Sequence, residues 1–197
     1  FAYETIPNEL YPFDWNTFLE NPAIIKVGVT NAKTGQCEYL DGKLLDKQCT
    51  MLKATCAIPF AFPVITFNGQ DYYDGGICDP IPVKQAKRDG HDKMLIVLTR
   101  PKGYQKNLSK ANIITSRRLK KRYPHLVKPL LTRHELYNET LNYCEMLEQT
   151  GKAVILRPSE DVQIDSFEKD LHKIDAIYHY GYQQAVENIE KIRALLK

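Results

Sequence analysis

An aspartate followed by two glycines is the feature of this sequence with the most chemical potential. Asp74, Gly75 and Gly76 follow a segment, residues 71–73, that has the composition of a β-strand. A carboxylate at the end of a strand lies where open α/β sheets favour catalytic and binding sites. We expect both glycines to adopt positive φ angles. The alternative is a turn in which Asp74 only bonds to its own backbone, and the tripeptide alone does not exclude it.

The cysteines and histidines favour structural roles. The five cysteines form an odd set without a Cys-x-x-Cys pair, which is typical of reduced thiols in the cytoplasm. We expect Cys56 to be a packed core thiol and Cys78 to be structural, although Cys78 follows the glycine turn and has the better claim to reactivity. The five histidines lack metal-ligand spacing, so no metal site is expected from them, and no organic cofactor is implied. Asp79 and Pro80 are expected to fix the turn into the next helix.

Basic residues gather in one part of the chain. Residues 93–134 hold 12 Lys and Arg residues and no Asp or Glu, although the whole chain carries a net charge of only +3. The densest cluster contains Arg117, Arg118, Lys120 and Lys121. It is either a solvated helix face or a patch that contacts anionic lipid headgroups. Binding to nucleic acid is not expected, because no nucleic-acid motif accompanies these charges.

Hydrophobic patterns predict an α/β fold with a mainly parallel sheet, flanking helices and a helical C-terminal tail. The predicted strands are residues 23–30, 36–40, 64–67, 71–73, 93–99 and 152–156, and the predicted helices are residues 46–56, 81–88, 126–147 and 165–196. Pro129 should kink or restart its helix, and Gly181 is a candidate break in the last one. Asn68 and Gly69 predict a tight hairpin. No apolar run reaches the length of a membrane span, so we expect a soluble chain.

Two stretches of sequence carry a resemblance to a known family. Residues 54–64 read Ala-Thr-Cys-Ala-Ile-Pro-Phe-Ala-Phe-Pro-Val, and residues 67–83 contain Tyr-Asp-Gly-Gly and then Asp-Pro-Ile-Pro-Val. Together they resemble the second signature block of patatin-like phospholipases. Residues 30–35 are similar to the strand and turn that precede this block, and residues 6–14 and 92–104 are similar to a bacterial branch of the family. The resemblance runs from about Ile6 to the final helix and is most specific between Lys53 and Gly103.

The resemblance implies a lipid acyl hydrolase of the phospholipase A or lysophospholipase type that uses a Ser-Asp dyad. The Asp corresponds to Asp74, and Gly75 and Gly76 shape the site around it. The family's Gly-x-Ser-x-Gly nucleophile segment has no counterpart, since the four serines are Ser109, Ser116, Ser159 and Ser166. We therefore expect a C-terminal portion of one patatin-like domain, with the N-terminal part of the fold and the serine upstream. Residues 1–103 would form its signature-bearing part and residues 104–197 the basic segment, helices and one strand.

This interpretation leads to further expectations and leaves alternatives open. The chain alone should be inactive, and it should associate with itself or with the missing N-terminal portion, because a truncated sheet exposes an edge and apolar surface. Its substrate would be a lipid or another acyl ester, and it would be cytoplasmic, with possible peripheral contact with an anionic membrane. The main alternative is a non-catalytic lipid-binding or regulatory module, and a basic nucleic-acid-binding domain is a third.

Overall fold

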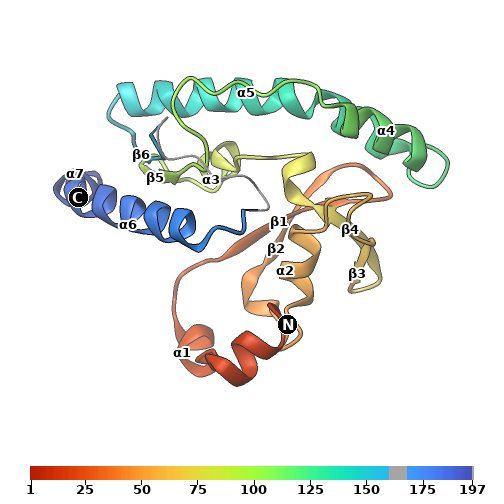
Figure 1. The fold of residues 1–197 in the computed structure, drawn as a ribbon, viewed down its shortest axis with the longest axis horizontal. Coiled ribbons are helices and arrows are strands. Elements are labelled where there is room, and N and C mark those ends of the chain that lie inside the picture. Colours follow the sequence, from red (N-terminus) through yellow and green to blue (C-terminus); the bar gives the residue numbers. More distant parts are fainter. Residues whose placement is uncertain (160–167, 197) are drawn as a thin grey trace. The chain divides into compact units, whose positions relative to one another are not determined.

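The computed structural model describes residues 1–159 and 168–196, which fold into two compact units (Figure 1). The first unit comprises Phe1–Ile81 and Asn107–Tyr137, and the second comprises Pro82–Lys106 and Asn138–Lys197. Helices and strands occur in both units, which confirms the α/β class. The single domain expected from the sequence, with a division near residue 103, stays a prediction.

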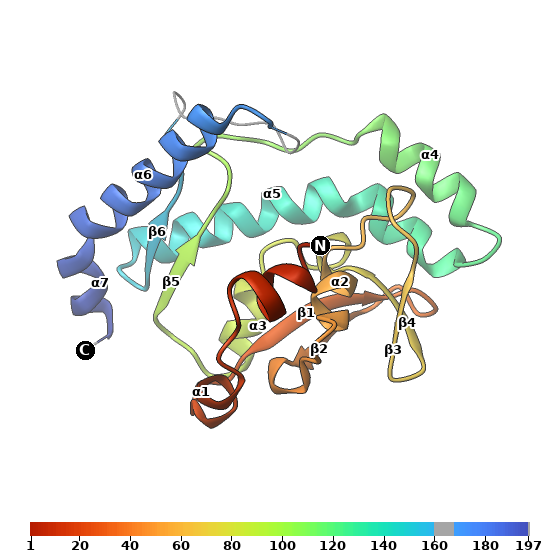
Figure 2. The ribbon, with the colours of Figure 1, turned by 60° about the horizontal axis from the view of Figure 1, so that its bottom comes forward.

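A four-stranded antiparallel sheet forms the centre of the first unit. Its strands follow the order β2 (Cys37–Asp41), β1 (Lys26–Asn31), β4 (Gln70–Asp74) and β3 (Ile65–Phe67). The predicted Asn-Gly turn joins β3 to β4 (Figure 2), and both of its residues have positive φ angles, 49° for Asn68 and 74° for Gly69. These values suit the turns that match the twist of a two-residue hairpin. The hairpin prediction is confirmed.

Strand β4 contributes side chains to two hydrophobic clusters, because successive side chains of a strand point to opposite faces. Tyr72 packs with Met51 and Ala54 of α2 (Thr50–Thr55). Tyr73 packs instead in a second cluster, with Tyr123 and Leu126. The segment that ends in Asp74 is therefore held between two sets of buried side chains.

The remaining helical segments of the first unit are short. They are η1 (Ile6–Leu10), α1 (Trp15–Glu20), η2 (Gly42–Leu44), η3 (Gly75–Ile77), α4 (Lys110–Leu119) and η4 (Pro124–Leu126). Helix α5 (Val127–Gln149) has residues in both units. It begins two residues before Pro129, so the proline lies in the first turn, where a backbone N–H has no partner within the helix. Of the two outcomes expected at Pro129, a kink or a restart of the helix, the structure shows a helix that starts beside the proline.

The second unit contains a pair of parallel strands, β5 (Met94–Val97) and β6 (Ala153–Leu156), with helices α3 (Val83–Arg88), α6 (Leu171–Glu187) and α7 (Ile189–Leu196). The C-terminal helix is broken at Asn188, not at Gly181, and the Asn188 side chain donates to the carbonyl of Gln184 at 2.9 Å. Asp170 caps α6 by accepting from the N–H of His172. The predicted start of this helix at residue 165 lies outside the described residues.

The expectation of a mainly parallel sheet is wrong for the described strands. Strand β4 pairs with β1 and β3, and all of these pairs are antiparallel. The short connections after Asn31 and Phe67 explain the antiparallel pairs β1–β2 and β3–β4, because a tight turn can join only antiparallel neighbours. The parallel arrangement is limited to β5 and β6, whose connection includes α4 and α5.

Asp71 of β4 provides a test of this packing at low pH. Its carboxylate accepts hydrogen bonds from Thr66 at 2.8 Å and from Tyr123 at 3.1 Å, and these bonds, the one from Thr66 foremost, lower its pKa. A pKa below the unfolded value stabilises the fold above about pH 4, and this contribution is lost as the pH falls through the folded pKa. Asp71→Asn should therefore reduce the loss of stability between neutral and acid pH, measured by urea unfolding at both. An unchanged pH dependence would contradict this assignment.

Candidate active site

The backbone of Asp74 is fixed by two neighbouring segments. Its N–H donates to the carbonyl of Ala57 at 2.9 Å, and its carbonyl accepts from the hydroxyl of Thr30 at 2.8 Å. Ala57 follows α2, and Thr30 belongs to β1. Because the backbone N–H and carbonyl of Asp74 are both hydrogen-bonded, the position of the backbone that carries the carboxylate is well defined.

The two oxygens of the Asp74 carboxylate have different surroundings. Oδ1 accepts from the N–H of Gly76 at 2.6 Å, which is the turn bond of the structural alternative. Oδ2 has no hydrogen-bond partner among the described residues, and the side chain is only partly buried. One oxygen therefore holds the turn while the other is available to an incoming hydroxyl. The structural and catalytic interpretations are compatible here.

Gly75 is required for space, Gly76 lies close to two side chains, and neither is needed for its φ angle. Neither has a positive φ, so the reason expected from the sequence is wrong. A Cβ on Gly75 would lie 2.2 Å from the carbonyl oxygen of Gly28 on β1. A Cβ on Gly76 would lie 3.0 Å from both an Arg133 nitrogen and Oδ1 of Asp74. The glycines thus let the turn approach β1 and Arg133 closely.

Arg133 is the site residue that sequence reasoning missed. It belongs to α5, and its Nε donates to the carbonyl oxygen of Gly76. Asp74 therefore binds the N–H of Gly76 while Arg133 binds its carbonyl. Arg133 lies 57 residues after Gly76 in an otherwise ordinary helical pattern, so no local motif marks it. In the sequence, Arg133 is marked only as one of the basic residues of the segment 93–134.

The neighbouring thiol and carboxyl groups have structural partners. Sγ of Cys78 lies 3.1 Å from the Thr30 hydroxyl, and a hydrogen bond with Cys37, together with burial, raises the pKa of Cys78. A thiol with a raised pKa is a poor nucleophile, which supports the structural interpretation of Cys78. Asp79 accepts from the hydroxyl of Tyr39, in keeping with a role in fixing the turn.

Cys56 is exposed, so the expectation of a packed core thiol is wrong. It occupies the C-cap of α2, where the short helix has already ended, and its side chain is not drawn into the core. A hydrogen bond with Cys56 is the main cause that raises the pKa of Tyr3 to about 12. The sequence pattern extended the helix through Cys56, whereas α2 ends at Thr55, one residue before it.

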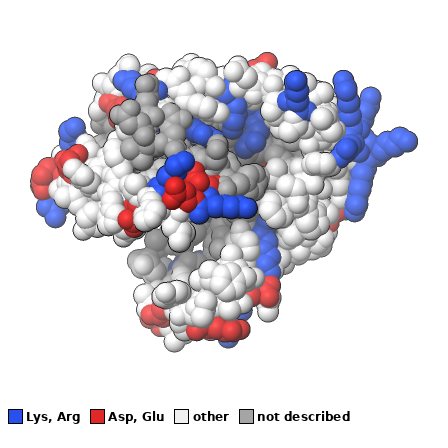
Figure 3. Space-filling view, in the orientation of Figure 1, with Lys and Arg blue, Asp and Glu red and all other residues white. Residues whose placement is uncertain are grey.

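The four residues of the predicted basic patch lie at the end of α4 and just after it. Arg117 and Arg118 belong to its last turn, Lys120 and Lys121 follow it, and all four are exposed. Figure 3 shows Lys and Arg side chains that project together from the right-hand edge, where α4 ends. The described residues contain no group of His, Cys, Asp and Glu that could hold a metal ion, and none of their helices has the length and apolar character to cross a bilayer.

The second unit has a cavity of about 460 Å³ at the ends of β5 and β6, facing α6. The two arginines that line it are already engaged. Arg157 pairs with Glu145 at 2.9 Å, and the Arg100 guanidinium lies 5.2 Å from the ring centre of Tyr104. None of the predicted site residues lines this cavity.

Comparisons with known proteins agree with the signature around Asp74. Residues 10–87 match the patatin-like phospholipase family. The segment that contains Asp74 and both glycines is therefore similar to this family. Residues 123–197 match a domain of unknown function, DUF6363. A lysophospholipase, NTE1 of Debaryomyces hansenii, is 28% identical over 142 residues, which are 68% of this chain and 9% of that protein.

The patatin-like segment contains nearly the whole candidate site. Strands β1 to β4, α2, Asp74 and both glycines all lie within residues 10–87. Arg133, in contrast, lies in the segment that matches DUF6363. The patatin-like turn is therefore held partly by a residue outside the patatin-like match.

Proposed function

We propose that this chain supplies the acid-base carboxylate of a lipid acyl hydrolase and that Asp74 is this carboxylate. The observation that carries the proposal is that the two carboxylate oxygens differ. Oδ1 accepts a hydrogen bond from the turn, and Oδ2 can accept one from an incoming hydroxyl. The patatin-like match and the similarity to a lysophospholipase support an ester of a phospholipid or lysophospholipid as the substrate. The nucleophile would be the serine of a Gly-x-Ser-x-Gly segment outside residues 1–197.

The proposed reaction has two steps. In the first, Oδ2 of Asp74 accepts the serine proton as the serine oxygen attacks the ester carbonyl carbon. The bond between that carbon and the alcohol oxygen then breaks, and Asp74 returns the proton to the departing alcohol. In the second step water attacks the acyl-serine, with Asp74 as its base. The serine-acyl bond breaks, the serine regains the proton, and the fatty acid is released.

Release of fatty acid from a lysophospholipid tests this proposal. The complete polypeptide encoded by the gene that carries this chain should hydrolyse lysophosphatidylcholine, with free fatty acid measured over time. The 197-residue chain on its own should release none, because it lacks the nucleophile. A folded complete polypeptide that binds the lipid without hydrolysing it would instead favour the non-catalytic lipid-binding module.

Arg133 is proposed as a positioning residue that acts through Gly76. Arg133→Met removes the hydrogen bond to the Gly76 carbonyl, and we expect kcat to fall about tenfold while KM stays unchanged, because a small displacement of Asp74 affects proton transfer more than binding. Arg133→Lys keeps one donor and should restore part of the loss. Equal effects of both substitutions on kcat, or an effect confined to KM, would contradict this role.

The basic patch is proposed to contact anionic headgroups, which would place the protein peripherally on a membrane. Arg117, Arg118, Lys120 and Lys121 are exposed together, as such contact requires. The expected cytoplasmic location and the association with itself or with an N-terminal portion stay predictions.

A further inference from the structure

A loop of the first unit presents three apolar side chains to solvent. Ile58, Phe60 and Phe62 are 48%, 66% and 52% exposed. Pro59, between the first two, is buried, so the loop has an inner side that packs and an outer side that does not. Three large apolar groups on five consecutive residues are more than the single exposed hydrophobics of ordinary surfaces.

The loop is held in a defined conformation. The N–H groups of Ala61 and Phe62 both donate to the carbonyl of Ile58, at 3.2 and 3.0 Å. Phe60 has a φ of 78°, a left-handed value that an aromatic residue rarely adopts. Strained backbone of this kind is concentrated in loops that bind or switch. The turn keeps the Phe60 ring outside, where it packs against no hydrophobic cluster of the described residues.

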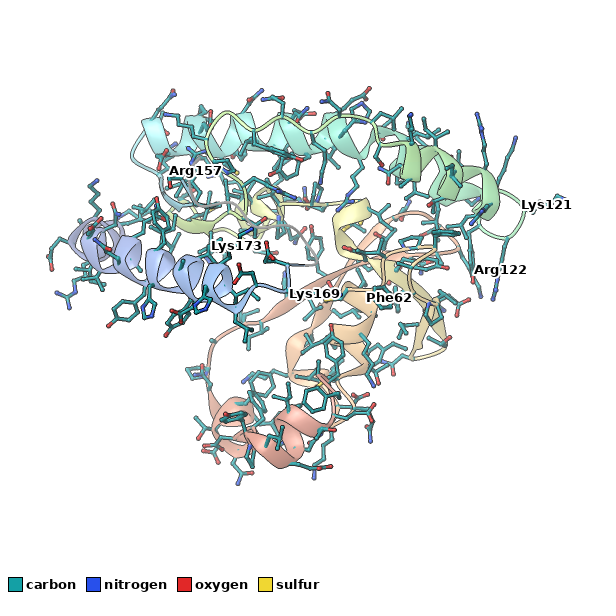
Figure 4. The ribbon with its side chains drawn as sticks, viewed as in Figure 1. Phe62, Lys121, Arg122, Arg157, Lys169 and Lys173 are labelled. Carbon is teal, nitrogen blue, oxygen red and sulfur yellow. The ribbon has the colours of Figure 1, made fainter. Side chains whose placement is uncertain are left out.

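The apolar loop is in direct contact with the basic patch. The guanidinium of Arg118 lies 4.2 Å from the ring centre of Phe60, which is a cation-π contact. The patch continues through Lys120 and Lys121 to Arg122. Figure 4 labels Lys121 and Arg122, after α4, and Phe62 of the loop. Residues 93–134 contain no acidic side chain, although Asp71 of β4 interacts with Arg122 at the end of the patch.

We propose that residues 58–62 and the basic end of α4 form one docking surface for an anionic lipid bilayer. The apolar side chains enter the boundary between headgroups and acyl chains, and the basic side chains bind the headgroups. Charge complementarity favours this occupant, and the apolar tips favour a bilayer over a purely polar anionic partner. The surface also lies next to the candidate site, because Ala57, which precedes the loop, accepts the Asp74 backbone N–H.

The inference deepens the proposed function, since a bilayer would be the source of the substrate, but binding can be measured without turnover. Vesicles of ether-linked phosphatidylcholine, alone or mixed with ether-linked phosphatidylglycerol, contain no scissile ester. Co-sedimentation of the complete polypeptide with these vesicles therefore reports docking whether or not the protein is a hydrolase. We expect binding to the mixed vesicles and much weaker binding to phosphatidylcholine alone.

Substitutions separate the two parts of the surface. Phe60→Ser with Phe62→Ser should weaken binding about tenfold or more, because the variant has no aromatic rings at these positions to transfer from water into the bilayer. Arg117→Gln with Lys121→Gln should weaken it about 25-fold, since each basic residue near the surface contributes ~1 kcal/mol, or about fivefold. Tyr178→Ser with Tyr182→Ser, both 65% exposed in the second unit, and Lys47→Gln with Lys102→Gln are the matched controls and should bind normally.

Insertion itself is measured by fluorescence. The chain has a single tryptophan, Trp15, so Phe62→Trp in a Trp15→Phe background reports on the loop alone. Brominated lipids should quench this tryptophan and shift its emission to the blue. The proposal would be overturned if the control variants lost as much binding, if brominated lipids did not quench the tryptophan, or if its emission were blue-shifted before vesicles are added. It would also be overturned if the protein bound a single-stranded oligonucleotide more tightly than vesicles and the Phe60→Ser, Phe62→Ser variant lost that binding.

Discussion

Replacing Asp74 with asparagine is expected to slow ester hydrolysis by a factor of about 10² to 10⁴, the usual contribution of a positioned general base. Asparagine has the same shape, and its amide oxygen can still accept from the N–H of Gly76, as Oδ1 of Asp74 does at 2.6 Å. The turn should therefore survive. The amide cannot take a proton from a hydroxyl, so the chemical step is lost. Steady-state hydrolysis of a lysophospholipid by the complete polypeptide measures this effect.

Asp71→Asn is the matched control for this prediction, because it makes the same chemical change three residues earlier on β4. Its carboxylate binds Thr66 and Tyr123 and has no place in the proposed reaction. At neutral pH the control should keep its kcat. If Asp74→Asn remained active, or if both variants lost activity in proportion to lost stability, Asp74 would be a structural residue and the proposed mechanism would be wrong.

Gly75→Ala is expected to destabilise the first unit by about 2–3 kcal/mol, within the range for overpacked sites. The added Cβ would lie 2.2 Å from the carbonyl oxygen of Gly28 and 2.6 Å from its carbonyl carbon. Both atoms are backbone, so no side-chain rotation relieves the contact. The β1 strand would have to move away from the turn, which would disturb its pairing of Val29 with Asp74.

Urea unfolding measures this loss as a lower midpoint at an unchanged slope. Gly28→Ala is the control, because a Cβ there would meet only the Tyr39 ring, at 3.5 Å, which is an ordinary contact. The free energy of unfolding of this variant should stay within about 0.5 kcal/mol of the value for the unchanged chain. A Gly75→Ala variant as stable as the control would show that the turn and β1 do not approach as closely as described.

Local signals predicted most of the first unit's elements. The Asn68-Gly69 turn and the β-branched residues of 26–30 act over a few residues, and the structure follows them. Strand direction depends on which segments pair, and the sequence pattern wrongly predicted a mainly parallel sheet. Strand β5 instead pairs with β6, 59 residues later at Met94 and Ala153. Such pairing is decided by tertiary packing, which a single sequence shows poorly.

The candidate site also contains features that neighbouring residues predict and features that they do not. The position of Asp74 at the end of a strand follows from its sequence neighbours and agrees with the structure. The reason for Gly75 depends on β1, more than 40 residues away, and the contact of Arg133 with Gly76 depends on α5. Cys56 was misjudged because α2 ends one residue before it. For Gly75 and Arg133 the missing information was a contact between segments far apart in the chain.

The position of the covalent nucleophile tests the central claim most directly. The complete polypeptide should be treated with a fluorophosphonate that reacts with activated serines, and the labelled residue should be located by mass spectrometry of its peptides. We predict a serine within Gly-x-Ser-x-Gly outside residues 1–197, labelled much more slowly in Asp74→Asn. Labelling of one of the chain's own four serines, or labelling that is independent of Asp74, would contradict the proposed Ser-Asp dyad.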